Sequence, residues 1–392
     1  MTGAGVSSAT DFLGLDAQLD REDLMIRDNV RAFVRAELLD EIPHWYEKGH
    51  LPRDIALEFG RLGLLGMHLS GYGCAGASAI AYGLVCQELE AGDSGLRSMV
   101  SVQGSLAMYA IWRWGSEEQK QEWLPQMAAG DAIGCFGLTE PDAGSDPGSM
   151  RTHARQVEGG DWVINGQKMW ITNGSVAEMA VVWAQTDEGV RGFVVPTNTR
   201  GFATQDIHGK LSLRASVTSE LLLEDVRLPA GAMLPEAAGL RGPLACLNEA
   251  RYGIVWGVVG AARACLEAAI DYSQTRIQFE RPIGGFQLTQ QKLADMLVDV
   301  TNGNLLALQL GRLKEAGTLR PEHVSLGKLA NVNAALRVAR VARTVLGANG
   351  ITLEYPVLRH ANILESVLTY EGTAEVHALT LGNALTGIPA FR

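Results

Sequence analysis

A carboxylate near the C-terminal end of the chain, Glu371, lies in a segment whose residue types could support acid–base chemistry. The segment reads Thr-Tyr-Glu-Gly-Thr-Ala-Glu from position 369 to position 375. Gly372 allows close approach of the backbone, and Tyr370 offers apolar cover that would raise the pKa of Glu371 and make it a general base. The other interpretation is a solvated carboxylate in the turn before a helix capped by Thr373. The segment by itself favours that simpler interpretation.

A cation with neighbouring hydroxyls, Arg97, could bind a carboxylate. It lies in Asp-Ser-Gly-Leu-Arg-Ser-Met-Val-Ser-Val-Gln, residues 93–103, beside an uncharged stretch and close to Ser98 and Ser101. A guanidinium with adjacent hydroxyls suits the two oxygens of a carboxylate. The alternative is a helical ion pair between Asp93 and Arg97, four residues apart. This short segment alone favours the ion pair.

Three further segments have residue types that suit a large ligand with planar and anionic parts. Glycines and hydroxyls in residues 135–146 offer donors to an anionic or carbonyl-rich group. The aromatic, hydroxyl and amide of residues 170–173, Trp-Ile-Thr-Asn, suit the face and edge of a ring. Residues 276–279, Arg-Ile-Gln-Phe, with Gln287 downstream, suit phosphate and adenine. Taken separately, an interdomain loop, a strand end before an Asn-Gly turn and a charged helix end explain them more simply.

The composition limits the classes of protein to consider. The chain has 392 residues, of which 47% are hydrophobic and 20% charged, and its formal net charge is −11. This length fits two to three globular domains of ordinary size. The acidity argues against a nucleic-acid binder, which needs a basic face, but not against a polyanionic cofactor in a basic pocket. Five scattered cysteines without a C-x-x-C pair fit a reducing compartment.

The sequence lacks the motifs of several other enzyme classes. G-x-G-x-x-G occurs at residues 71–76, where we expect a glycine turn, and the sequence has no G-x-x-x-x-G-K-[ST], no G-x-S-x-G and no H-E-x-x-H. This disfavours a Rossmann dehydrogenase, an α/β-hydrolase and a catalytic metal. No membrane span is expected, because glycines interrupt the longest uncharged stretch, residues 62–87. Without an apolar or Arg-rich leader, the expected location is cytoplasmic.

The expected elements divide the chain into three blocks. Residues 1–135 read as an α-helical domain, with a capping box at Ser116–Gln119 and a helix end at Gly130. Residues 136–238 read as a β-domain, in which Asn165-Gly166 predicts a hairpin between residues 162–164 and 168–171. Residues 239–392 read as a helical bundle, with apolar residues at 3.6-residue spacing in 293–300 and 329–339.

Together these segments resemble the acyl-CoA dehydrogenase family over nearly the whole chain, and within it most of all the glutaryl-CoA dehydrogenases. The resemblance rests on the motifs in residues 71–76, 93–98, 101–103, 136–141, 211–216, 248–253, 370–373 and 376–382. It implies an α+β fold with an N-terminal helical domain, a middle β-barrel domain and a C-terminal four-helix bundle. It also implies one FAD per subunit, an acyl-CoA substrate, a homotetramer and electron-transferring flavoprotein as electron acceptor.

The resemblance also implies a role for individual residues. Glu371 matches the catalytic base, and Arg97 matches the residue that holds the distal carboxylate of glutaryl-CoA. The other positions that match substrate-binding residues are Glu90, Ser101, Ser145, Arg251, Tyr370 and Gly372. The positions that match FAD-binding residues are Phe136, Leu138, Thr139, Gly144, Ser145, Trp170, Thr172, Asn173, Arg276, Gln278, Phe279, Gln287, Leu346, Gly347, Gly350 and Thr373. Of these, residues 276–279 and 287 match contacts that the family makes across a subunit interface.

The implied reaction is the oxidative decarboxylation of glutaryl-CoA to crotonyl-CoA and CO2, a step of lysine and tryptophan degradation. Glu371 would abstract the α-proton, and the β-hydride would pass to the flavin. The alternatives are a non-decarboxylating glutaryl-CoA dehydrogenase, a short-chain acyl-CoA dehydrogenase, an acyl-CoA oxidase and a flavin-fold binding protein without catalysis. Two departures from the subfamily, Leu96 in place of Tyr and Ala348 in place of Gly, concern affinity rather than reaction class.

Overall fold

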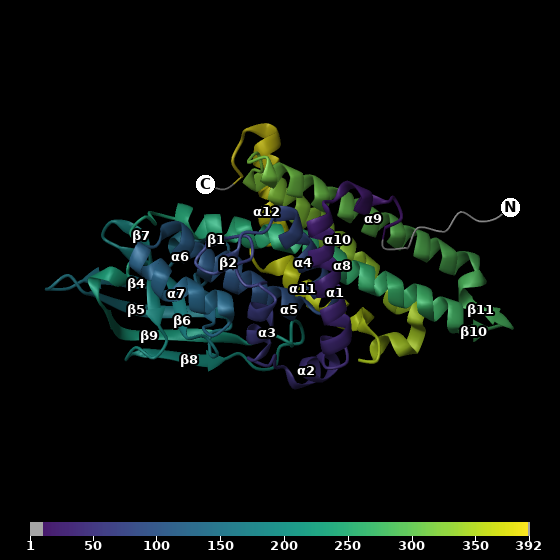
Figure 1. Ribbon diagram of the computed structural model, residues 1–392, viewed down its shortest axis with the longest axis horizontal. Coiled ribbons are helices and arrows are strands. Elements are labelled where there is room, and N and C mark those ends of the chain that lie inside the picture. Colours follow the sequence, from purple (N-terminus) through teal and green to yellow (C-terminus); the bar gives the residue numbers. More distant parts are fainter. Residues whose placement is uncertain (1–10, 391–392) are drawn as a thin grey trace.

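The computed structural model describes residues 11–390, with the sheet towards one end of an elongated molecule and the longest helices extending to the other (Figure 1). The N-terminal part is helical, as expected. It contains α1 (Arg21–Phe33), α2 (Ile42–Lys48), α3 (Ile55–Arg61), α4 (Ala79–Gly92), α5 (Ser94–Ser101), α6 (Tyr109–Trp114), α7 (Glu117–Ala129) and a hairpin of β1 (Ser70–Gly71) and β2 (Cys74–Ala75).

The expected start and end of α7 are confirmed. The Ser116 hydroxyl accepts a hydrogen bond from the Gln119 N–H at 3.3 Å, and the Gln119 side chain accepts one from the Ser116 N–H at 2.9 Å. The helix ends at Gly130, which adopts a left-handed conformation with φ of 81°. This capping box satisfies two donors that the first helical turn would otherwise leave unpaired.

The middle part is a seven-stranded mixed sheet, which confirms the expected β-domain. Its strands are β3 (Gly134–Gly137), β4 (His153–Gln156), β5 (Trp162–Thr172), β6 (Met179–Thr186), β7 (Gly189–Pro196), β8 (Phe202–Asp206) and β9 (Thr218–Leu228). They follow the order β3-β6-β4-β5-β9-β8, with β7 also paired to β6. The β3–β6 and β4–β6 pairs are parallel and the other pairs are antiparallel.

The predicted hairpin at Asn165-Gly166 is wrong. Residues Trp162–Thr172 form one strand, β5, and its register against β9 shifts between Ile164 and Gly166. The Asn165 side chain bonds across to Asp225, donating at 3.0 Å and accepting from its N–H at 2.8 Å. At Gly166 a Cβ would lie 2.4 Å from the Thr152 hydroxyl oxygen. Glycine is therefore required here for close packing and a bulge rather than for a turn.

The C-terminal part consists of long helices and a short hairpin. Its elements are α8 (Arg241–Thr275), β10 (Ile277–Gln278), β11 (Arg281–Pro282), α9 (Gln287–Glu315), α10 (Pro321–Leu346), α11 (Pro356–Thr369) and α12 (Ala374–Thr386). Met296, Val300, Val332, Leu336 and Ala339 are buried in one shared core. The expected 3.6-residue periodicity is thus confirmed, since it places the apolar face of α10 against α8, α9 and α11, and that of α9 against α8 and α10.

Helix α8 is the one helix in residues 11–390 that is long and apolar enough to cross a membrane. Scattered charges interrupt α8, so it is not one of the uncharged stretches of the sequence. However, 78% of its most apolar 18-residue window is buried inside the protein. It packs against α4, α9, α10 and α11 and runs from the sheet to the β10–β11 hairpin (Figure 1). These contacts are typical of a core helix.

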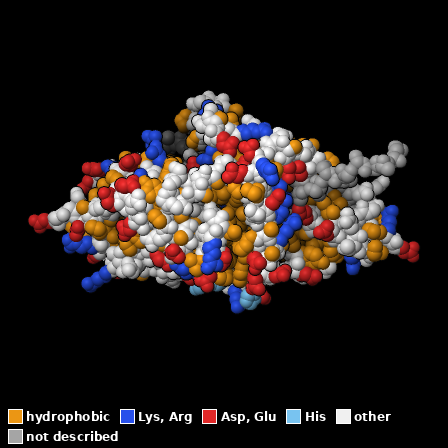
Figure 2. Space-filling model, viewed as in Figure 1, with side chains coloured by type: hydrophobic (Ala, Val, Ile, Leu, Met, Phe, Trp, Pro, Cys, Tyr) orange, Lys and Arg blue, Asp and Glu red, His pale blue; other side chains and the backbone are white. Residues whose placement is uncertain are grey.

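The visible surface mixes charges of both signs. On the face in Figure 2, Lys and Arg side chains lie among Asp and Glu side chains, and hydrophobic side chains reach the surface near the middle. This face therefore lacks the continuous basic stripe that binding to a nucleic-acid backbone requires.

Candidate active site

Glu371 lies in the short turn that joins α11 to α12. Its backbone is left-handed, with φ of 54°, and Gly372 follows with φ of 95°. A Cβ on Gly372 would lie 2.9 Å from the His377 ring and 3.2 Å from the Arg251 guanidinium, so a side chain at position 372 would be both strained and obstructed. The left-handed conformation at Glu371 is costly for a residue with a side chain, and such strain is common at functional sites.

The Glu371 carboxylate is in a setting that suits a base. Its Oε2 atom is buried and has no hydrogen-bond partner among the described residues. Burial raises the pKa of Glu371, although the nearby cations Arg97, Lys328 and Arg251 oppose that rise. A carboxylate with a raised pKa and an unused oxygen can take a proton from a ligand. The alternative of a solvated carboxylate in an ordinary turn does not fit this burial. Thr373 nevertheless caps α12, accepting from the Val376 N–H at 3.3 Å.

Arg97 lies on α5 and is fully buried. Its Nε donates to Glu90 at 2.7 Å and its Nη2 donates to the Tyr370 hydroxyl. Its Nη1 is buried without a partner, and so is the hydroxyl of Ser101, one turn further along. Because buried polar groups are normally paired, these two donors point to a polar ligand. The residue that follows Tyr370 is Glu371, so the two motifs singled out from the sequence lie side by side.

The alternative ion pair between Asp93 and Arg97 is absent. One oxygen of Asp93 accepts from the Gly95 N–H at 2.8 Å and caps α5, and the other pairs with Arg359 of α11. Glu90 replaces Asp93 as the partner of Arg97. Its second oxygen accepts from the Ser94 hydroxyl at 2.7 Å, which keeps both carboxylate oxygens bonded.

Arg251 of α8 holds the backbone of the same turn. Its Nε donates to the Glu371 carbonyl at 2.6 Å, and its Nη1 donates to the Asn248 side chain at 3.3 Å. The structure therefore brings five of the predicted substrate-site residues together around Glu371, and these are Glu90, Arg97, Arg251, Tyr370 and Gly372. Ser101 lies one turn of α5 beyond Arg97. Ser145 lies on the exposed loop after β3.

The two segments predicted to contact a planar ring are joined by a buried lysine. Lys168 of β5 donates to Glu140 at 2.8 Å and to the Leu138 carbonyl at 3.1 Å, and the Met169 N–H donates to the Thr139 carbonyl at 2.9 Å. These bonds fix the loop of residues 136–145 beside residues 170–173. Phe136 and Leu138 are buried, whereas Gly144 and Ser145 are exposed.

Residues 170–173 present unused ring and amide surfaces. Trp170 has a left-handed backbone, with φ of 63°, and 57% of its surface is exposed. Asn173 also has a positive φ, and its Nδ2 is buried without a partner. A large exposed aromatic, the partly exposed Thr172 and a buried donor without a partner fit the face and edge of a flavin ring.

The remaining residues predicted to bind FAD lie elsewhere. Arg276, Gln278, Phe279 and Gln287 are exposed at the β10–β11 end of the molecule, opposite the sheet (Figure 1). Leu346 is the last residue of α10, and Gly347 and Gly350 follow it, where Asn349 donates to the Tyr272 hydroxyl of α8 at 3.0 Å. One chain does not bring these residues to Trp170. The contact of residues 276–279 with FAD across a subunit interface stays a prediction.

Sequence reasoning missed Lys328 of α10. Its side chain is 1% exposed, and its Nζ donates to the carbonyls of Tyr370 and Gly372. A signal was available, because Lys328 lies four residues from both Val324 and Val332 on the apolar face of a predicted helix. A lysine on such a face is buried only where hydrogen-bond acceptors from other parts of the protein pair with its ammonium group.

The fold and this arrangement of residues agree with comparisons to known proteins. Models of the acyl-CoA dehydrogenase N-terminal, middle and C-terminal domains match residues 20–131, 135–226 and 237–386. The chain belongs to the acyl-CoA dehydrogenase family.

Individual relatives narrow the similarity. The human mitochondrial short-chain specific acyl-CoA dehydrogenase is 35% identical over 94% of this chain and 91% of that protein. Glutaryl-CoA dehydrogenase from Desulfococcus multivorans is 34% identical over 92% of this chain and 96% of that protein. The crystal structure of a glutaryl-CoA dehydrogenase from Mycobacterium smegmatis in complex with FADH2 is 61% identical, with a TM-score of 0.97 over 98% of this chain and 100% of that one.

Proposed function

We propose that this protein is an FAD-dependent dehydrogenase that oxidises and decarboxylates glutaryl-CoA to crotonyl-CoA and CO2. The observation that carries the proposal is the buried Arg97 Nη1, which has no partner among the described residues, near Glu371, whose charge acts on Arg97. Ser101 Oγ, one turn further along α5, is a second buried hydroxyl without a hydrogen bond in that part of the chain. A second carboxylate, at the far end of an acyl chain, matches these donors. The similarity to glutaryl-CoA dehydrogenases of M. smegmatis, 61% and 66% identical, supports the choice of substrate.

The residues beside Lys168 would hold the flavin. Trp170, Thr172 and Asn173 would face its ring, and the loop of residues 136–145 would line the same side. When bound, FAD accepts the β-hydride of the acyl chain. The M. smegmatis structure with FADH2 supports FAD as the cofactor, together with the fit of Trp170 and of the free Asn173 amide.

The first step is loss of the α-proton of the thioester to Glu371 Oε2. This proton is only weakly acidic, so the step needs a base with a raised pKa and a donor to the thioester carbonyl. Burial supplies the first requirement. The Glu371 N–H can supply the second, because within residues 11–390 it donates to no other backbone group.

The second step is decarboxylation, in which Arg97 binds and then releases the carboxylate. Loss of the α-proton and the β-hydride converts glutaryl-CoA to glutaconyl-CoA. Glutaconyl-CoA is a vinylogous β-keto acid, so breaking its bond to the carboxylate carbon releases CO2 and leaves a delocalised dienolate. The protonated Glu371 then returns its proton to the far carbon, which gives crotonyl-CoA. Arg97 shares its charge with Glu90, with Nε and Glu90 Oε2 2.7 Å apart. That sharing weakens its hold on the substrate carboxylate and lets CO2 leave.

Mass analysis of the acyl-CoA products tests this proposal. The FAD-loaded protein is incubated with glutaryl-CoA and an artificial electron acceptor. Crotonyl-CoA is expected. Glutaconyl-CoA as the only product would support a dehydrogenase that does not decarboxylate. A parallel incubation uses butyryl-CoA. If glutaryl-CoA stays unchanged while butyryl-CoA is oxidised, the short-chain alternative is favoured, which the similarity to the human short-chain enzyme supports.

The electron acceptor, assembly and location extend the proposal. We expect electron-transferring flavoprotein as acceptor, since a structure whose description names that protein is 31% identical to this chain. A homotetramer and a cytoplasmic location stay predictions. A homotetramer would offer a place for residues 276–279 next to Trp170 of another subunit.

A further inference from the structure

Lys328 is a buried cation whose bonds go to the turn that contains the base. Its Nζ donates to the Tyr370 carbonyl at 2.5 Å and to the Gly372 carbonyl at 2.6 Å. In the described part of the chain it forms no ion pair with a carboxylate, although the charge of Glu371 acts on it. Burying an ammonium group is costly unless acceptors and a nearby negative charge compensate. The turn of residues 370–372 supplies both.

Two cations from two helices hold three consecutive carbonyls of that turn. Lys328 of α10 binds the carbonyls before and after Glu371, and Arg251 of α8 binds the Glu371 carbonyl itself. The turn needs such restraint, because Glu371 and Gly372 both have positive φ values, 54° and 95°. A strained backbone conformation persists only where its surroundings hold it.

We propose that Lys328 is a positioning residue that holds the turn of residues 370–372 and so fixes the Glu371 carboxylate towards the substrate. The inference rests on the proposed function and adds a residue to it. Two of the three N–H donors of Lys328 are used by the Tyr370 and Gly372 carbonyls, and in this account Lys328 does not touch the substrate.

Tyr370 links Lys328 to Arg97, the residue proposed to bind the substrate carboxylate. Tyr370 accepts from Lys328 through its carbonyl and from Arg97 through its hydroxyl. Its ring lies within 5.8 Å of the Arg97 guanidinium carbon and 5.9 Å of Lys328 Nζ. Lys328 therefore restrains one residue on which both the base and the arginine depend.

The charges around Lys328 determine how its removal changes the pH dependence. Glu371 from the turn, Arg251 from α8 and Arg97 from α5 act on it, and it acts in turn on His377 of α12, whose pKa burial lowers to about 3. Burial lowers the pKa of Lys328 to about 7, and Glu371 opposes that fall. Its positive charge in turn lowers the pKa of Glu371. Removing that charge raises the pKa of Glu371 further, so the base becomes active only at higher pH.

The test compares Lys328→Met, which keeps the shape of the side chain, with Lys328→Arg, which keeps its charge. The control Arg337→Met removes an exposed cation from the same helix. Each protein is loaded with FAD, and the anaerobic rate of flavin reduction at saturating acyl-CoA is followed against pH. Bound FAD, thermal unfolding and crotonyl-CoA affinity are measured on the same samples. The acyl-CoA used is one that reduces the wild-type flavin.

We expect Lys328→Met to bind FAD and crotonyl-CoA as the wild type does, to reduce flavin about 100-fold more slowly and to move the acidic limb of its profile to higher pH. Lys328→Arg should keep the wild-type acidic limb and recover part of the rate. A wild-type rate and profile in Lys328→Met would overturn the inference, as would a rate loss that only follows lost FAD.

The design also covers a Lys328→Met protein that does not fold and a wild type that does not use glutaryl-CoA. If Lys328→Met does not fold, a shifted acidic limb in the folded Lys328→Arg protein overturns the inference, and an unshifted limb with a reduced rate supports it. If the wild type is reduced by butyryl-CoA but not by glutaryl-CoA, the proposed substrate fails, while the comparison of Lys328 variants still stands on butyryl-CoA.

Discussion

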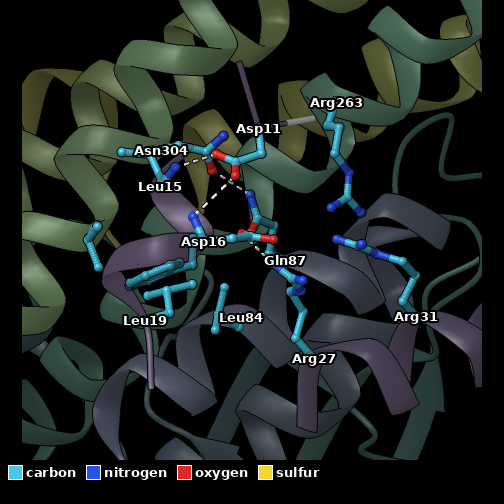
Figure 3. A pocket seen from close by; sticks show the side chains of 12 residues that line it. Asp11, Leu15, Asp16, Leu19, Arg27, Arg31, Leu84, Gln87, Arg263 and Asn304 are labelled. Atoms are coloured by element: carbon cyan, nitrogen blue, oxygen red, sulfur yellow. Dashed lines mark hydrogen bonds and ion pairs between the residues drawn. The ribbon is translucent and has the colours of Figure 1, made fainter. Parts of the chain in front are cut away.

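Two carboxylates on α4, Glu88 and Glu90, are both buried and both bound to arginine, but their surroundings differ. Glu88 receives two bonds from Arg263 of α8, each 2.7 Å long, and two from Arg31 of α1, at 2.9 and 3.0 Å. Figure 3 shows Arg31 and Arg263 pointing towards each other beside a small pocket. The Glu88 cluster, defined as Glu88, Arg31 and Arg263, thus uses both carboxylate oxygens twice.

The Glu90 cluster, defined as Glu90, Arg97, Ser101 and Glu371, is incomplete by comparison. Arg97 Nη1, Ser101 Oγ and Glu371 Oε2 are all buried and unpaired within residues 11–390. In the Glu88 cluster the carboxylate takes four arginine bonds, and among its buried atoms in the described chain only Arg263 Nε lacks a hydrogen bond, 3.8 Å from Glu267. The Glu90 cluster, two residues along the same helix, leaves two donors and a base oxygen unpaired. A carboxylate whose oxygens are all bonded is typical of a structural site, and several unpaired buried groups together indicate a functional one.

The cavity beside the Glu88 cluster agrees with a structural role. It has a volume of about 40 Å³ and is lined by residues of α1, α4, α8 and α9 together with the segment before α1. Arg27, on its wall, is already paired with Asp16 and Asp28. A space of this size holds only a few water molecules, so it offers no room for a substrate.

The largest loss of turnover is expected from replacing Glu371, the proposed base of the Glu90 cluster. Glu371→Gln keeps the size of the side chain and removes the base, so we expect turnover of glutaryl-CoA to fall by ~10²–10⁴-fold. Thermal unfolding should change little, because Glu371 Oε2 has no partner to lose. Steady-state turnover and unfolding of the same FAD-loaded sample check both statements. A variant with more than a tenth of wild-type turnover would remove Glu371 as the base.

The Glu88 cluster should show the opposite pattern. Glu88→Gln leaves two arginines without their carboxylate, and breaking such a buried pair costs about 3–5 kcal/mol of unfolding free energy. Denaturant unfolding measures that loss, and the turnover per folded protein should match the wild type. A stable Glu88→Gln protein with impaired turnover would reverse the assignment of the two clusters.

The same cluster predicts a pH dependence of stability. Burial opposes ionisation of Glu88, but Arg263 and Arg31 outweigh it and lower its pKa from 4.5 to about 2. A lowered pKa means that the contribution is fully present above pH 4.5 and is lost as the pH falls towards 2. The free energy of unfolding should therefore fall more steeply in this range for the wild type than for Glu88→Gln. Parallel curves would contradict the assignment.

A smaller effect separates ligand contacts from structural ones. Ser101→Ala removes a buried hydroxyl that forms no hydrogen bond of normal geometry with the described residues, although it lies near the Tyr82 hydroxyl, so it should lower stability only a little. The substitution should weaken the binding of glutaryl-CoA by about 1 kcal/mol, which corresponds to a rise in its KM of roughly fivefold. The KM for butyryl-CoA should stay unchanged. Loss of stability without a change in KM would show that the hydroxyl serves the fold.

The features predicted from sequence were those that depend on local residue types. The close approach at Gly372, the capping box at Ser116 and the spacing in α9 and α10 are local, and the structure contains them. The ion-pair partner of Arg97, in contrast, depends on a residue far away in the sequence. Arg97 pairs with Glu90 because Asp93 is taken by Arg359, which lies 266 residues away in the chain.

Two other features depended on tertiary contacts. Asn165-Gly166 reads as a hairpin turn, but close packing against Thr152 keeps it within one strand. Lys328 reads as an interruption of an apolar face, and only the distant turn of residues 370–372 explains its burial. Short motifs predict which residues can do chemistry, whereas the groups that position those residues come from other parts of the chain.

The central claim, that the Glu90 cluster is built for a second carboxylate, is tested most directly by substrate selectivity. The double variant Arg97→Met/Glu90→Gln removes the arginine and leaves no unpaired carboxylate behind. The measurement is kcat/KM for glutaryl-CoA divided by kcat/KM for butyryl-CoA, in the variant and in the wild type. Losing a buried charged partner of the substrate costs ~2–5 kcal/mol, so the ratio should fall by about 30-fold or more while butyryl-CoA is still oxidised. An equal loss on both substrates would contradict the claim.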